Sequence, residues 1–161
     1  MQKRRILSVV CGMLSCIMCF SVVVMPVSAE EIAGYHETTM TEEEATDTWY
    51  SVGRGVYLAF GTAKVMRDGK ARINISGSTN AHSICEELRL ALYLDESPDN
   101  SSYGTIGVYH YSEKNDASVS GYETGLQAKS GYYYSVRGTH TVYHGGTRET
   151  TDTCTDAITA S

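Results

Sequence analysis

Tyrosine is the residue type in this sequence whose chemistry best suits contact with another molecule. The 12 tyrosines, all of them after position 29, exceed the 2 phenylalanines and 1 tryptophan of the whole chain. A tyrosine ring is flat and apolar and ends in a hydrogen-bonding hydroxyl, which suits wet recognition surfaces, although tyrosine is also a good strand residue. We expect the contact residues of a binding surface to be Tyr109, Tyr111, Tyr133, Arg137, His140 and Tyr143.

The histidines do not predict a metal site. His140 and His144 are four positions apart, which suits chelation on a helix but separates them by about 13 Å on a strand. A three-histidine site with His110 would require the chain to bend before Gly145. We therefore expect no metal and no cofactor.

Catalytic signatures are absent from the sequence. Serines, histidines and acids occur, but no local pattern such as G-x-S-x-G or H-E-x-x-H joins them. Glu86 and Glu87 would point to opposite faces of a strand and could not flank one scissile bond. The chain is not expected to be an enzyme, and a small hydrolase remains an alternative.

Two of the five cysteines, Cys85 and Cys154, lie outside the apolar N-terminal run. An even number of cysteines in a secreted domain predicts a disulfide bond, here between Cys85 and Cys154. The alternatives are two free thiols, or a metal site that adds His82, which falls short of the four ligands of structural zinc.

Alternation with a period of two predicts the strands that would carry these residues. Ile73 and Ile75 alternate with polar residues, and the leucines from Leu88 to Leu94 do the same. Gly145 and Gly146 would close a hairpin between the last two long strands. The pattern predicts an all-β fold, an antiparallel β-sandwich of immunoglobulin or fibronectin type, with a small β-barrel or jelly roll as the alternative. Strands are expected within residues 56–60, 71–76, 88–94, 105–111, 118–123, 132–142 and 147–158.

The N-terminus has the form of a secretory signal peptide over residues 1–29. Three basic residues precede an apolar run, and Ser28 and Ala29 supply a small-residue cleavage site. The run is also long enough to span a bilayer if it were retained as an anchor. We expect cleavage, a secreted extracellular product and no membrane association after cleavage.

The remaining 132 residues carry 10 basic and 19 acidic side chains, a formal net charge of −9. This sign argues against nucleic-acid partners. Residues 30–48 hold seven acids and no Lys or Arg. That composition predicts a disordered acidic leader, followed by one folded domain over residues 49–161.

The segments 69–80, 131–140 and 154–158 resemble those of a family of small secreted proteins from Gram-positive, often gut-dwelling, bacteria. The family is known only as a domain of unknown function, and the resemblance covers about residues 50–159. It implies a secreted β-rich module of bacterial source and carries no activity or site residues with it.

These observations favour a secreted, non-catalytic binding module whose unknown extracellular ligand is a glycan, a cell-envelope component or a protein. A secreted antagonist of bacteriocin or toxin type is a further alternative, beside the small hydrolase.

Overall fold

The computed structural model describes residues 29–53 and 56–161, and this part of the chain consists of strands, turns and loops. The expected signal peptide lies outside the described residues except for Ala29. Within the described ranges, no helix is long and apolar enough to cross a membrane. The nine strands are β1 (Ala29–Glu31), β2 (Gly34–Met40), β3 (Glu44–Ser51), β4 (Leu58–Arg67), β5 (Arg72–Ser97), β6 (Gly104–Gln127), β7 (Tyr133–His144), β8 (Thr147–Cys154) and β9 (Ile158–Thr159).

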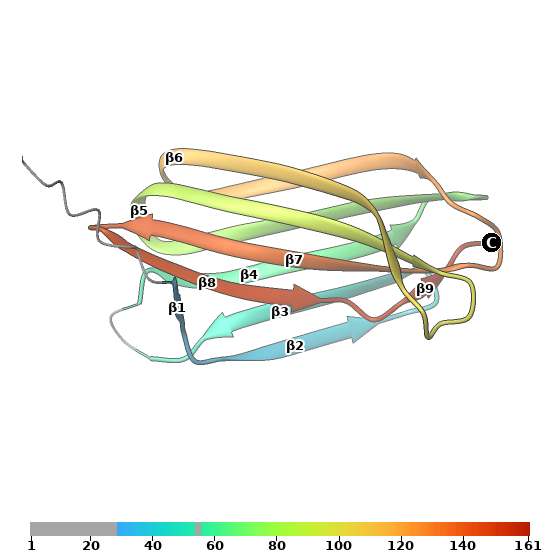
Figure 1. Ribbon diagram of the computed structural model, residues 1–161, viewed down its shortest axis with the longest axis horizontal. Helices are drawn as coiled ribbons and strands as arrows, with labels where there is room; N and C mark the ends of the chain where they lie inside the picture. Colours follow the sequence, from blue (N-terminus) through green and yellow to red (C-terminus); the bar gives the residue numbers. More distant parts are fainter. Residues whose placement is uncertain (1–28, 54–55) are drawn as a thin grey trace, which may run out of the picture.

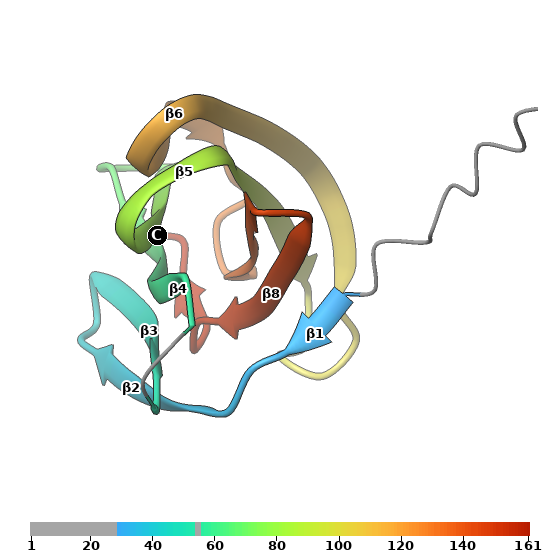
Figure 2. The same ribbon diagram turned by 90° about the vertical axis from the view of Figure 1, so that its left-hand side faces the viewer.

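All nine strands belong to one sheet, in the order β1-β8-β7-β5-β4-β3-β2, with β6 paired to β5 and β9 paired to β7. Every pairing is antiparallel except that of β1 with β8. The strands β2 to β8 run along the long axis of the molecule (Figure 1), and the view along that axis shows the sheet curling round on itself (Figure 2). The architecture is therefore a curled antiparallel sheet that forms a half-barrel.

The long strand β5 organises this sheet. Its first part pairs with β4, its second part pairs with β7, and β6 follows both parts on the other edge. The β5–β6 register shifts between Asn80 and Cys85, an irregularity of the kind that bends a strand and increases its twist. One bent strand thus contributes to both halves of the curled sheet.

The core lies on the concave side of the sheet. The alternation predicted from the sequence is confirmed here, because Ile73, Ile75 and the leucines from Leu88 to Leu94 are all buried. The predicted hairpin is also confirmed, since His144 pairs with Thr147 across a turn whose two glycines both have positive φ. A two-residue turn of that geometry matches the twist of the strands that it joins.

The prediction of a disordered leader over residues 30–48 is wrong, because β2 and most of β3 lie in this segment. Strand β3 alternates between the two sides of the sheet and buries Ala45, Asp47 and Trp49. The carboxylate of Asp47 accepts hydrogen bonds from the His36 ring and from the backbone N–H of Cys154 at 2.7 Å. The sequence did not reveal this alternation because Asp47, an acidic residue, occupies a buried position. Its burial is possible because partners from elsewhere in the chain satisfy its carboxylate.

The fold-class prediction is confirmed as all-β and antiparallel. The immunoglobulin-like sandwich is not confirmed, because the strands are joined by hydrogen bonds into one curled sheet. The predicted strands over residues 71–76 and 88–94 are two parts of the single strand β5, and those over 105–111 and 118–123 are two parts of β6.

The predicted disulfide does not form, and both Cys85 and Cys154 are free thiols. Glu87, two residues after Cys85, pairs with Tyr143 of β7, whereas Cys154 pairs with Arg137 of the same strand. Six positions of β7 correspond to about 20 Å, while the Cα atoms of a disulfide lie within about 7 Å. The separation along β7 therefore excludes the bond.

Candidate binding surface

The six residues expected to make contacts divide between the two faces of the sheet. Tyr109, Tyr111 and His140 point toward the concave inner face, where the core lies. Tyr133, Arg137 and Tyr143 occupy odd-numbered positions of β7 and lie on the convex outer face, since successive side chains of a strand alternate. The structure therefore brings together only half of the expected set.

Tyr109 and Tyr111 belong to the inner face because of their register. They pair with Leu92 and Leu90 of β5, which are core residues. The Tyr111 hydroxyl donates a hydrogen bond to Glu123 at 2.8 Å, and burial together with this carboxylate raises the pKa of Tyr111 to about 12. Both rings are half-buried packing groups of the strand β6.

His140 is fully buried, so the prediction that it contacts a ligand is wrong. Its Nδ1 lies 3.0 Å from the Thr79 hydroxyl, and its Nε2 lies 2.9 Å from the Thr153 hydroxyl. Thr79 already donates to the carbonyl of Arg89, so it accepts from Nδ1–H, and Nε2 then accepts from Thr153. Burial lowers the pKa of His140 to about 3, and the ring is neutral at physiological pH.

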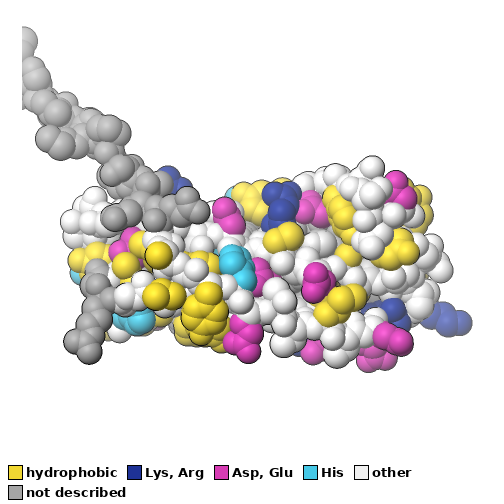
Figure 3. Space-filling model, turned by 90° about the horizontal axis from the view of Figure 1, so that it is seen from below, with side chains coloured by type: hydrophobic (Ala, Val, Ile, Leu, Met, Phe, Trp, Pro, Cys, Tyr) yellow, Lys and Arg dark blue, Asp and Glu magenta, His cyan; other side chains and the backbone are white. Residues whose placement is uncertain are grey.

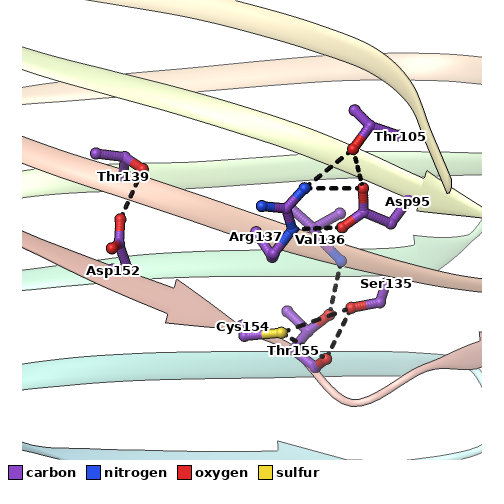
Figure 4. A network of polar contacts seen from close by, with 9 residues as sticks. All are labelled: Asp95, Thr105, Ser135, Val136, Arg137, Thr139, Asp152, Cys154 and Thr155. Atoms are coloured by element: carbon purple, nitrogen blue, oxygen red, sulfur yellow. Dashed lines mark hydrogen bonds and ion pairs between the residues drawn. The ribbon is translucent and has the colours of Figure 1, made fainter. Parts of the chain in front are cut away.

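On the outer face, Arg137 is held by a network of polar contacts (Figure 4). Its Nε donates to Asp95 at 2.6 Å, and one terminal nitrogen donates to both Asp95 and Thr105. Burial alone would raise the pKa of Asp95, but the hydrogen bonds from Arg137 and Thr105 hold that pKa below its ordinary value. The guanidinium also lies 5.2 Å from the centre of the Tyr93 ring, so the pair presents a fixed stack to solvent.

A second aromatic and cationic stack surrounds Tyr143. Arg89 of β5 lies 4.8 Å from the centre of the Tyr143 ring, and Arg148 of β8 lies 5.9 Å from it. Arg89 is also bound through two hydrogen bonds to Glu87, at 2.8 and 3.1 Å. Tyr143 is thereby flanked by guanidinium groups from the strands on either side of β7.

The two stacks are separated by a hollow region. One hollow of about 430 Å³ is lined by Ala91, Thr139 and the Tyr143 stack, and another of about 500 Å³ is lined by Thr139 and the Tyr93 stack. Ala91 pairs with Thr139 and with His110, so its small side chain leaves space between larger neighbours. We call this surface the outer platform: Arg89, Ala91, Tyr93, Arg137, Thr139, Tyr143 and Arg148.

Five members of the outer platform were not expected from the sequence: Arg89, Ala91, Tyr93, Thr139 and Arg148. Tyr143 and Arg148 pair directly across the Gly145-Gly146 turn, so the predicted hairpin contained the signal for Arg148. Arg89 and Tyr93 alternate with the buried leucines of β5, which places them on the outer face. Their position beside β7 depends on the non-local pairing of β5 with β7.

Tyr133 lies at the start of β7, beyond the Tyr93 stack. It pairs with Ser97 and with Thr159 of β9. Four positions separate it from Arg137, or about 13 Å along the strand. Tyr133 therefore belongs to the outer face but lies outside the outer platform.

One arrangement of titratable groups resembles part of a hydrolytic site. The Nδ1 of His36 lies 2.9 Å from the buried carboxylate of Asp47, and His36 and Cys154 line the same 500 Å³ hollow. Among the described residues, however, the Cys154 thiol contacts Ser135 and the carbonyl of Thr155 and makes no hydrogen bond to His36. Such chemistry requires a hydrogen bond between the nucleophile and the base, and this bond is not formed between Cys154 and His36.

A metal centre is not found in the part of the chain that the structure describes, where no three His, Cys, Asp or Glu side chains come together as ligands.

The face formed by β2 and β3 shows acidic side chains spread along its length and few Lys or Arg side chains (Figure 3). A hollow of about 790 Å³ on this side is lined by residues of β2, β3 and β8, including His36 and Trp49. It holds none of the six expected contact residues.

The fold and this surface define a small, curled-sheet module with a polar and aromatic outer face. Residues 27–158 match the model of the DUF6147 family, which is described as a family of unknown function. The chain therefore belongs to the DUF6147 family. No curated protein matches the sequence.

Proposed function

We propose that the protein is a secreted, non-catalytic binding module that recognises an extracellular ligand, a glycan or a component of the cell envelope, through the outer platform. The observation that carries this proposal is the presence of two stacks, Tyr93 with Arg137 and Tyr143 with Arg89 and Arg148, on either side of the hollow at Ala91.

The chemistry of these groups supports recognition of a polar, ring-shaped ligand. Tyrosine rings offer flat apolar area while their hydroxyls remain hydrated, and the arginines fix the rings by cation–π contact. Thr139, which borders both hollows, adds a hydroxyl that donates to Asp152 at 2.6 Å. Since these side chains come from regular strands, the platform keeps its shape before the ligand binds, which lowers the entropy lost on binding.

Co-sedimentation with peptidoglycan, intact bacterial cells and mucin glycans tests this proposal. The variant Tyr93→Ala/Tyr143→Ala removes both rings of the platform and should abolish binding. The matched control is Tyr122→Ala, which removes an exposed tyrosine from the distant part of β6. Equal binding by both variants would contradict the proposed surface, and no binding by the native protein to any of the three would contradict the glycan and envelope ligands.

A small hydrolase is the second candidate, and the hydrogen bond between His36 and Asp47 is the observation that favours it. Hydrolysis by Cys154 would require His36 to reach the thiol after a ligand binds. Any hydrolytic activity is measured by the release of product from a substrate. If the Cys154→Ser variant retains all of that activity, this candidate is removed.

We also propose that the two halves of the curled sheet are arranged as a sandwich. The two halves of the curled sheet face each other across the core, where Gly61 of β4 lies against the ring of His140 of β7. This contact supports a sandwich-like relation of the halves, with β5 and β6 shared between them.

A further inference from the structure

The region around Tyr143 is locally cationic in a protein whose net charge is −6. Lys114, Glu87, Tyr143 and Arg148 lie on one row across the four strands β6, β5, β7 and β8. Arg89 adds a third cation from the next position on the outer face of β5. The row and Arg89 together hold three cations and one carboxylate.

Glu87 is fully engaged by its neighbours. Both of its oxygens accept hydrogen bonds from Arg89, and Lys114 is its register partner on β6. The Arg89 hydrogen bond and the two nearby cations hold the pKa of Glu87 below its ordinary value, so it is ionised at neutral pH and matches the charge of Arg89. The charge of Arg148, two strands away, is not balanced by this acid.

Arg148 has no acidic partner among the described residues, where five ion pairs occur and none includes it. Its Nε is buried and makes no hydrogen bond within the described part of the chain. A guanidinium presents its donors as a planar fork that fits a carboxylate or a phosphate. An anion that draws this group toward the hollow would therefore give a partner to a buried donor that has none among the described residues.

The rest of the hollow suits the sugar that would carry such an anion. Ser112, Thr139 and Thr141 line it with hydroxyl groups, and the Tyr143 ring stands beside Arg148. Hydroxyl groups of a sugar exchange hydrogen bonds with these neutral side chains, and the apolar face of a sugar ring packs on an aromatic ring.

We propose that the ligand of the outer platform is an acidic polysaccharide, and that its carboxylate or phosphate binds Arg148 beside Tyr143. This inference rests on the proposed function and names the class of ligand for the same surface.

Binding titrations of the purified full-length protein test the inference with three probes: an oligogalacturonate, a poly(glycerol phosphate) and a neutral galactan oligosaccharide. At least one acidic probe should bind ten-fold or more tightly than the neutral probe, and its affinity should fall as salt is raised from 20 to 300 mM. The probe that binds distinguishes a carboxylate ligand from a phosphate ligand.

The variant Arg148→Gln should lose at least ten-fold in affinity for the acidic probe. Arg72→Gln, the same substitution at an exposed position on the other part of β5, should change it by less than two-fold. Arg148→Lys keeps the charge but loses the planar fork, so its affinity should lie between those of the native protein and Arg148→Gln. Thermal melts of each variant check that the fold is kept.

Two outcomes overturn the inference and separate it from the proposed function. If the neutral probe binds as tightly as the acidic ones and Tyr143→Ala abolishes that binding, the platform is a binding surface but not for anions. If neither acidic probe binds while the protein sediments with cells or peptidoglycan, the ligand class is wrong and the proposed function stands.

Discussion

Gly61 of β4 lies directly against the ring of His140 of β7, so that a Cβ atom on Gly61 would stand 2.4 Å from the imidazole. The ring cannot move aside easily, because Thr79 and Thr153 hold its two nitrogens. This contact joins the two halves of the curled sheet at a point where any larger side chain would separate them.

Gly61→Ala should therefore destabilise the protein. Overpacking of a filled core costs about 1–3 kcal/mol, because neighbouring side chains leave their preferred rotamers. Urea unfolding of the variant and the native protein measures the difference. The control is Gly104→Ala, where an added Cβ meets nothing within 4 Å. Equal stability of Gly61→Ala and Gly104→Ala would contradict the close contact.

His140 should make the stability of the fold depend on pH in the mildly acidic range. The unfolded chain takes up a proton near pH 6.5, whereas the pKa of the buried ring is lowered to about 3. Between these values the unfolded state binds more protons, so stability is full above pH 6.5 and decreases as the pH falls. At pH 5 the loss should be about 2 kcal/mol.

Urea unfolding at pH 7.5 and pH 5.0 measures this loss. In His140→Gln, which keeps a polar side chain of similar reach and does not titrate, the difference between the two pH values should shrink. An unchanged difference in this variant would assign the pH dependence to other groups.

The strands that the sequence predicted are those whose pattern is local. The leucines from Leu88 to Leu94 alternate with polar residues, and the glycines at 145 and 146 supply the positive φ that a tight hairpin needs. The prediction for residues 30–48 is wrong because the burial of Asp47 depends on the backbone N–H of Cys154, 107 positions away. Composition within the segment carries no trace of that partner.

Part of the outer platform could also be predicted from local pattern. Positions 133, 137 and 143 share one parity and position 140 has the other, so strand alternation alone separates His140 from the outer face. The side on which Tyr109 and Tyr111 lie was not predictable in this way. It follows from their pairing with Leu92 and Leu90, which depends on the bend and register shifts of β5 and β6.

Tyr134→Phe should destabilise the protein although it removes a single oxygen atom. The Tyr134 hydroxyl donates to Glu96 at 2.7 Å and accepts the backbone N–H of Lys129 at 2.7 Å. Its loss leaves a half-buried carboxylate and a backbone donor short of one partner each, at a cost of about 1–3 kcal/mol. Urea unfolding checks this value, with Tyr122→Phe at an exposed position as the control. Similar midpoints for the two variants would show that the bonds to Glu96 and Lys129 contribute nothing.

The two free thiols should differ strongly in their reactivity. Cys154 is exposed, whereas Cys85 is buried, and burial together with the charge of Glu149 raises the pKa of the Cys85 thiol. The thiolate is the species that reacts with alkylating agents, so iodoacetamide should label Cys154 in the folded protein and label Cys85 only after unfolding. Peptide mapping by mass spectrometry distinguishes the two sites from the cysteines near the N-terminus. A linked Cys85–Cys154 peptide in a non-reduced digest would contradict both the free thiols and the register of β7 that keeps them apart.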